Sequence, residues 1–142
     1  MVLRTILTQS VSTYAKGENF MKLNTFMAIA AVVAFLFGLS FILMPVQTMS
    51  MYGVTLDITG QFLGRYLGSA FIGVAVLTWF ARNTKENGAL RAILLGAFVL
   101  SLTGLVVALF DVFTGIGNAL VWSTVVIYLL LGAGFGYFYF KK

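Results

Sequence analysis

The sequence predicts an all-α membrane protein in which four transmembrane helices form an antiparallel bundle with both termini in the cytoplasm. Three observations predict this fold. Hydrophobic residues make up 61% of the 142-residue chain and charged residues only 9%, whereas soluble domains carry about 25% charged residues. Four nearly uncharged runs each approach the roughly 20 residues needed to cross a hydrocarbon core. Basic residues gather on one side of these runs.

The four predicted spans are residues 26–44, 62–80, 92–110 and 119–140. Membrane strands are excluded because the runs lack a two-residue alternation, and an open sheet would leave backbone groups unpaired in lipid. We expect the first span to end at Pro45, because the proline ring cannot continue the helical hydrogen-bond ladder. The fold is therefore predicted to be wholly helical.

The connections between the spans differ in character. Residues 46–60 are too polar to cross the membrane and too apolar to form a free loop, so we expect them at the interface. Asn87-Gly88 marks a turn in the second connection. The sequence TGIGN, residues 114–118, predicts a tight hairpin that makes the third and fourth spans neighbours.

The distribution of lysine and arginine predicts the orientation. Arg65, Asp57 and Asp111 fall on one side of the membrane, and eight of the nine basic residues fall on the other. The positive-inside rule places the basic side, which holds both termini, in the cytoplasm. The eight residues are Arg4, Lys16, Lys22, Arg82, Lys85, Arg91, Lys141 and Lys142.

Residues 1–23 form an N-terminal extension to a membrane domain of residues 24–142. Two interpretations of this extension stay open. The apolar positions fit one face of a short interfacial helix; they are Leu3, Ile6, Leu7, Val11 and Tyr14. Alternatively, translation starts at Met21, which directly precedes Lys22 and the first span, and the upstream residues are not translated.

The residue types narrow the chemistry. The chain has no histidine and no cysteine, which excludes haem and iron–sulfur ligation, thiolate or imidazole zinc sites and disulfides. The acidic residues, Glu18, Asp57, Glu86 and Asp111, form no motif of a catalytic or metal site. We therefore expect a protein that is not an enzyme, with no catalytic residues, no cofactor and no metal. The net charge of +5 does not indicate a nucleic-acid partner, because the basic residues flank apolar spans.

Arg65 is the one charged residue inside a predicted span. At 1.5 Å per residue it lies about 9 Å from the midplane, where its long side chain can reach the interface at a cost below the roughly 2.5–3.5 kcal/mol of a central arginine. It belongs to a face of polar and small residues at three- and four-residue spacing, which we expect to pack against another helix. This face comprises Gln61, Gly64, Arg65, Gly68, Ser69 and Gly73.

Asp111 is the predicted partner of Arg65. If the second and third spans form a hairpin that turns near residue 87, Arg65 comes level with the neighbourhood of residue 109. A structural ion pair at the outer end of the bundle would then share the cost of desolvation. Asp57 is a second candidate partner. The alternative is that Arg65 and Gln61 contact the head group of a ligand.

Small residues four positions apart recur in every span and favour close helix packing in lipid. We interpret them as internal packing, with a homodimer interface as the alternative. The predicted packing glycines are Gly64, Gly68, Gly73, Gly104, Gly132 and Gly136.

Several features together resemble the DoxX-like group of small, uncharacterised bacterial four-helix membrane proteins. They are the first span closed by Pro45, the Tyr52-Gly53 turn, the segment GRYLGSAFIG with Arg65, and the basic connection that begins at Arg82. The resemblance extends over most of residues 26–140. DoxX is associated with membrane oxidoreductase assemblies that handle sulfur compounds or quinones, so the resemblance implies an accessory or quinone-proximal role and a bacterial inner-membrane location.

The leading functional hypothesis is a non-catalytic integral membrane protein that serves as an accessory or structural subunit of a membrane complex. Its expected partners are the lipid bilayer and a larger membrane protein complex or a second copy of the chain. The alternative is a binder of a quinone or lipid at the outer interface. A small transporter is a third hypothesis, although the first span lacks the carboxylate that small multidrug exporters use.

Overall fold

The computed structural model describes residues 1–85 and 87–141, with the side chains of Ala15, Lys16 and residues 18–21 outside the description. The described elements are all helices: α1 (Val2–Leu43), α2 (Pro45–Met51), α3 (Ile58–Ala81), α4 (Gly88–Thr114) and α5 (Val121–Phe140). Four helices are long and apolar enough to cross a membrane, through Lys22–Leu43, Ile58–Ala81, Gly88–Thr114 and Val121–Phe140. The helical class and the four candidate spans are thus confirmed.

The helix boundaries follow from local sequence signals. Proline at the first position of α2 separates it from α1, as expected at Pro45. The Asp57 side chain caps α3 by accepting a 2.7 Å hydrogen bond from the Gly60 N–H. Asn87 caps α4 in the same way, with a 2.9 Å bond from the Leu90 N–H. The predicted turn at residue 87 is therefore also the start of a helix.

The end of α4 is a glycine-dependent turn. Gly115 has a φ of 73°, a backbone conformation that residues with a Cβ rarely adopt. It allows the Ile116 N–H to bond the Asp111 carbonyl at 2.9 Å and the Gly115 N–H to bond the Val112 carbonyl at 3.3 Å. This is the Schellman pattern, and it sends the chain directly into the turn before α5.

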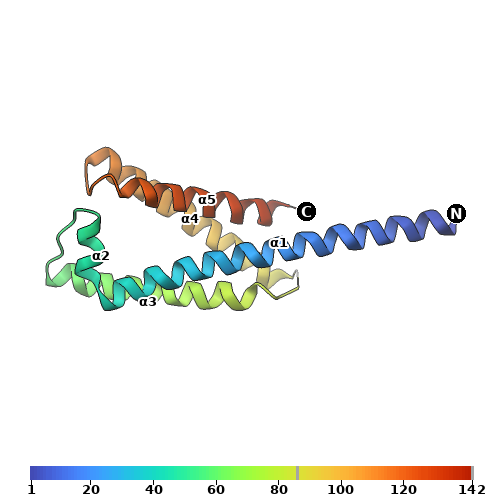
Figure 1. Cartoon of the computed structure of the whole chain (residues 1–142), viewed down its shortest axis with the longest axis horizontal. Coiled ribbons are helices and arrows are strands. Elements are labelled where there is room, and N and C mark those ends of the chain that lie inside the picture. Colours follow the sequence, from blue (N-terminus) through green and yellow to red (C-terminus); the bar gives the residue numbers. More distant parts are fainter. Residues whose placement is uncertain (86, 142) are drawn as a thin grey trace.

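The long helices pack as two pairs, α1 with α3 and α4 with α5 (Figure 1). Contact between α3 and α4 is slight, although they follow one another in the chain. Within the first pair, the backbones of Gly38 and Gly68 approach closely. A Cβ added at Gly68 would lie 2.7 Å from the Gly38 carbonyl oxygen. Small residues in lipid permit this kind of close crossing.

The second pair is built from glycines that face aromatic rings. A Cβ added at Gly104 on α4 would lie 2.5 Å from the Tyr128 ring of α5, and one added at Gly136 on α5 would lie 2.8 Å from the Phe98 ring of α4. Gly104 is thus level with Tyr128, and Phe98 is level with Gly136. These contacts set the register of α4 against α5.

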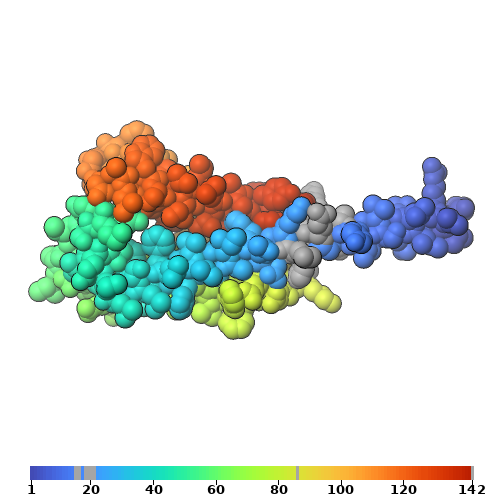
Figure 2. Space-filling model, in the orientation of Figure 1, coloured from blue at the N-terminus to red at the C-terminus, as the bar shows by residue number. Residues whose placement is uncertain are grey.

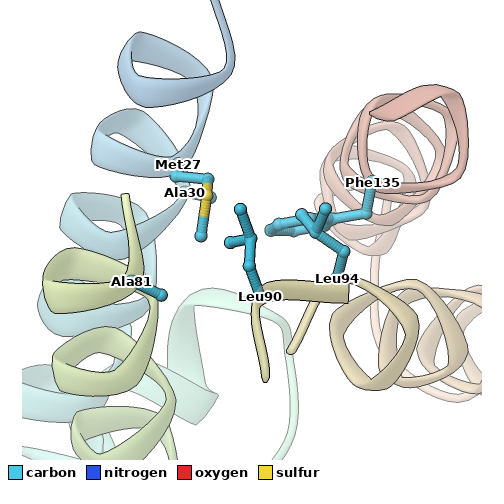
Figure 3. Packing of buried hydrophobic residues seen from close by; sticks show 6 residues of the cluster. All are labelled: Met27, Ala30, Ala81, Leu90, Leu94 and Phe135. Atoms are coloured by element: carbon cyan, nitrogen blue, oxygen red, sulfur yellow. The ribbon is translucent and has the colours of Figure 1, made fainter. Parts of the chain in front are cut away.

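The two pairs meet at one end in a buried cluster, here called the core cluster (Figure 3). Figure 3 shows side chains from all four long helices converging on it. Met27 is fully buried there, and Phe26 stacks edge to face on Phe135 with ring centroids 4.9 Å apart. The core cluster consists of Met27, Ala30, Ala81, Leu90, Leu94 and Phe135.

At the opposite end, here called the loop end, the turn after α2 is joined to the turn after α4. Asn118 donates its backbone N–H to the Tyr52 carbonyl at 2.8 Å and its side-chain amide to the Met51 carbonyl at 2.9 Å. Its side-chain oxygen accepts a 2.9 Å bond from the Leu120 N–H. A single asparagine therefore ties the two helix pairs together at this end, where α2 lies between them (Figure 1).

The N-terminal extension continues α1 away from the rest of the protein (Figure 2). Residues 2–14 are all exposed and belong to the same helix as the first candidate span. Of the residues used in the charge and start-site arguments, Glu86 and Lys142 lie outside the described residues, as do the side chains of Lys16, Glu18 and Met21. Both interpretations of the extension stay predictions.

Candidate functional site

The candidate site is a cavity of about 700 Å³ between the two helix pairs. It lies between the core cluster and the loop end, and all four long helices contribute to its wall. Along α5, the lining residues run from Val121 to Phe135, which is about 21 Å at 1.5 Å per residue. The cavity is thus elongated along α5, and its volume falls within the roughly 300–1,000 Å³ of ligand pockets.

The cavity opens sideways, between α3 and α4. Lining residues on α1 and α5 are buried or half-buried. Exposed lining side chains occur instead on the other two helices. On α3 these include Leu63 (61% exposed) and Leu67 (48%), and on α4 they include Leu100 (45%) and Val107 (59%). This mouth exists because α3 packs on α1 and α4 packs on α5.

The wall is mainly apolar, and the rings of Phe37, Phe41 and Phe71 line one side of it. Phe41 and Phe71 are stacked, with ring centroids 6.3 Å apart and an interplanar angle of 13°. These rings join α1 to α3 beside the close Gly38 and Gly68 crossing. The apolar wall suits a hydrocarbon or ring system better than a polar solute.

The carboxylate and several of the hydroxyl groups of the cavity wall lie toward the loop end. Asp111 comes from the last turn of α4, and it is half-buried. Thr124 Oγ1 lies 3.4 Å from the Tyr52 hydroxyl, and Tyr128 follows Thr124 by one helical turn. Within the described part of the chain, neither the Asp111 carboxylate nor the Tyr128 hydroxyl makes a hydrogen bond or ion pair.

Toward the core cluster, Ser101 and Thr78 line the cavity. The Ser101 hydroxyl is satisfied by its own helix, through a 2.8 Å bond to the Ala97 carbonyl. Thr78 is only 3% exposed, and its hydroxyl makes no hydrogen bond to any described residue. Thr78 therefore offers an unused donor and acceptor deep in the cavity.

The predicted site residues are dispersed in the structure. Arg65 is exposed on α3 and does not line the cavity. Gln61, one turn before it, is half-buried and also absent from the wall. Asp57 is exposed and caps α3. Of the four predicted polar residues, the structure places Asp111 alone in the cavity wall.

Arg65 and Asp111 form no ion pair among the described residues of the chain. The prediction rested on a hairpin of α3 with α4. The structure instead packs α3 along α1 and α4 along α5. The slight contact between α3 and α4 includes the core cluster, where Ala81 lies close to the start of α4. Residues equally distant from the turn are therefore not opposite one another.

The predicted packing glycines have different surroundings. Gly68 contacts α1, and Gly104 and Gly136 face rings across the α4 and α5 contact. A Cβ at Gly64 would lie 3.5 Å from Pro45, and one at Gly132 would lie 3.5 Å from Ser101. Gly73 has open space beside it.

Sequence reasoning did not single out Asn118, Tyr128 or Thr78. Asn118 was present only as the last residue of the TGIGN turn, and its bonds reach residues 66 and 67 positions away in the chain. Tyr128 stands in an apolar run without a local signal. A helical-wheel comparison of Thr78 with Phe71 and Val74 would have placed it on their face of α3.

Groups of three or more acidic residues that could hold a metal ion are absent from the part of the chain that the structure describes. The cavity wall described above offers hydroxyls and one carboxylate, and these groups can bind an amphiphile by hydrogen bonds or charge.

Comparison with known proteins places the chain in a family. The family model described as "Domain of unknown function (DUF8292)" matches residues 2–140, a range that includes all but the first residue of the N-terminal extension. No curated protein and no solved structure matches the chain. Since the family model covers nearly the whole sequence, the chain belongs to the DUF8292 family.

Proposed function

We propose that the protein is an integral membrane protein that binds a lipophilic molecule in the cavity between its two helix pairs. The single observation that carries this proposal is an elongated apolar cavity of about 700 Å³ that opens sideways between α3 and α4. In a bilayer this mouth would face acyl chains. A ligand already dissolved in the membrane could then reach the cavity without passing through water.

The proposed placement is a four-span antiparallel bundle in a bacterial inner membrane, with both termini cytoplasmic. Large apolar side chains are exposed along all four candidate spans, which suits contact with lipid rather than water. The core cluster would lie toward the cytoplasm and the loop end toward the opposite side. The predicted excess of basic residues at the termini and the second connection supports this orientation.

Contacts between basic and aromatic residues near the core cluster also support it. The Arg82 guanidinium lies 3.4 Å from the centroid of the Trp79 ring, and the Arg91 guanidinium lies 5.4 Å from that of Tyr139. Tryptophan, tyrosine and basic residues are typical of membrane interfaces, and basic residues are typical of the cytoplasmic one. Arg65, on the other half of α3, would reach the opposite interface by extending its side chain.

Binding is a better account of the cavity than catalysis. General acid and base catalysis requires positioned proton donors and acceptors with suitably tuned pKa values, and Asp111 is the one carboxylate in the described wall. Hydrophobic pockets with a few polar groups at one end typically orient a ligand. We therefore propose a binding role without a resident cofactor.

The test is native mass spectrometry of the protein purified from its own membranes in a mild detergent. We expect a retained lipophilic molecule in stoichiometric amount. Ala34 lines the cavity and is half-buried, so Ala34→Phe should fill part of the volume and lower the bound fraction. Ala70 is exposed on α3 and does not line the cavity, so Ala70→Phe is the matched control.

A second variant keeps the test conclusive if Ala34→Phe does not fold. Leu67 lines the mouth and is 48% exposed, so Leu67→Trp should narrow the opening without overfilling the interior. Ligand retention by both cavity variants at the level of Ala70→Phe would contradict binding in this cavity.

A second candidate function is the accessory or structural subunit of a larger membrane complex, or a homodimer. The observation that favours it is the outer surface of α3, where Arg65, Ser69 and Gly73 are exposed at four-residue spacing and Gly73 has open space beside it. Close packing of small residues is a common mode of helix association in lipid. The resemblance to the DoxX-like group supports the same role. A stoichiometric protein partner in the mass spectrum, with an empty cavity, would favour this candidate.

A further inference from the structure

We infer that the cavity selects a lipophilic molecule whose polar end is a protonated amine, held at Asp111. This inference rests on the proposed function and names the ligand class of the same site. It differs from the alternative prediction, in which Arg65 and Gln61 contact the head group, because both residues lie outside the cavity wall while Asp111 is part of it.

The charge of Asp111 favours a cationic ligand. Asp111 is the one residue with a formal charge among the described residues of the wall. Its carboxylate is half-buried and has no ion pair or hydrogen bond to any described residue. A carboxylate that is partly removed from water without a partner is costly. A ligand cation at this position would provide the missing partner.

The position of Asp111 at one end of the cavity suits the polar end of an elongated ligand. The Asp111 carbonyl is bonded by Ile116 in the turn at the loop end, so Asp111 marks this end of the cavity. The hydroxyls of Tyr52 and Thr124 lie 3.4 Å apart at the same end. A primary ammonium has three N–H donors, which can be shared between the carboxylate and neutral hydroxyl oxygens. The hydrocarbon part of the ligand would extend along the apolar wall toward the core cluster.

The Asp111 carboxylate also discriminates between ligand head groups. An ionised carboxylate accepts hydrogen bonds and donates none. A carboxylate or phosphate head carries the same negative charge and also accepts hydrogen bonds, so Asp111 would repel a ligand with either head. A quinone head presents carbonyl oxygens, which are also acceptors and so cannot form a hydrogen bond with the Asp111 carboxylate. Among simple amphiphiles, an ammonium head combines charge complementarity with donor capacity.

The experiment is a competition between three probes with the same alkyl chain: dodecylamine, dodecanol and dodecanoic acid. The full-length protein is mixed with equal concentrations of all three in a mild nonionic detergent at neutral pH, and native mass spectrometry reports the occupancy of each. We expect dodecylamine to exceed dodecanol by about tenfold, because charge-assisted hydrogen bonds are stronger than neutral ones. Dodecanoic acid should bind least.

The decisive variant is Asp111→Asn, which preserves the shape of the side chain and removes its charge. We expect the preference for the amine over the alcohol to disappear. The matched control is Asp57→Asn, which makes the same change at an exposed residue outside the cavity wall. Asparagine can still cap α3, so this control should keep the full preference.

A second variant covers the case in which Asp111→Asn does not fold. Val107 lines the mouth, is 59% exposed and precedes Asp111 by one helical turn. Val107→Lys would place a cation within reach of Asp111, so it should abolish the amine preference while leaving Asp111 in place.

The outcomes separate the inference from the proposed function. Equal binding of amine and alcohol by the wild-type protein, or preference for the acid, would overturn the inference and leave lipophile binding standing. An amine preference that survives both Asp111→Asn and Val107→Lys would overturn the role of Asp111. No binding of any probe would overturn the proposed function and the inference together.

Discussion

Gly68 on α3 packs backbone to backbone against Gly38 on α1. A Cβ added at Gly68 would lie 2.7 Å from the Gly38 carbonyl oxygen, and one added at Gly38 would lie 2.9 Å from the Gly68 carbonyl oxygen. Neither backbone can move aside without shifting its helix. This crossing holds the first helix pair together beside the cavity.

Gly68→Ala should therefore destabilise the protein by about 1–3 kcal/mol, the usual range for overpacking. Gly73→Ala on the same helix meets nothing within 4 Å, and it should be neutral or stabilising because alanine favours helices more than glycine does. Thermal melting in detergent, followed by circular dichroism, compares the two. Equal melting temperatures for both variants would rule out the close crossing.

A second prediction concerns the register of α4 against α5. Gly104→Ala should also destabilise the protein by about 1–3 kcal/mol, because its Cβ would lie 2.5 Å from the Tyr128 ring. In the Tyr128→Ala background the same change should cost much less, which a double-mutant cycle measures as a coupling energy. Gly96→Ala, with open space beside it, is the control. Purely additive effects of Gly104→Ala and Tyr128→Ala would mean that the two residues do not touch.

A third prediction concerns the exposed arginine. Because Arg65 has no ion pair to Asp111 among the described residues, Arg65→Gln should change the free energy of unfolding by no more than about 0.5 kcal/mol. The measurement is the same thermal melt, carried out on Arg65→Gln, Asp111→Asn and the double variant. A large loss for Arg65→Gln that is absent in the Asp111→Asn background would instead establish the ion pair predicted from the sequence.

The fourth prediction tests the orientation in the membrane. The chain has no cysteine, so single cysteines report their side without background labelling. In intact cells, a membrane-impermeant maleimide should label Thr55→Cys and Thr114→Cys, which lie near the loop end. Thr13→Cys and Thr84→Cys should react only after the membrane is opened. The reverse pattern would place both termini outside, and labelling of all four from one side would exclude four spans.

The four candidate spans could be predicted because their signals are local. Pro45 separates α1 from α2, and the four apolar runs match the four candidate spans within a few residues. Asp57 and Asn87 act as helix caps through side-chain bonds to residues only three positions ahead. Each of these features depends on neighbours in the chain, so the sequence contains the necessary information.

The tight TGIGN turn predicted the pair of α4 with α5, which the structure confirms, but no local signal predicted the pair of α1 with α3. Chain connectivity favoured a hairpin of α3 with α4 and hence an Arg65 and Asp111 pair. In the structure, α1 with α3 and α4 with α5 form the extensive contacts. Glycines meet another glycine or an aromatic ring across these contacts. The fit between surfaces from distant parts of the chain decides such contacts, and a single sequence does not display it.

By itself, the sequence determined the helical class, the approximate extent of the four candidate spans and several helix boundaries, because hydropathy, proline, glycine and capping residues act over a few residues. The tertiary structure alone decided that the two helix pairs enclose a cavity, that Arg65 faces outward and that Asp111 faces inward. The physical reason is that a side chain's surroundings depend on which helix packs beside it and in what register, and these are set by contacts between residues far apart in the chain.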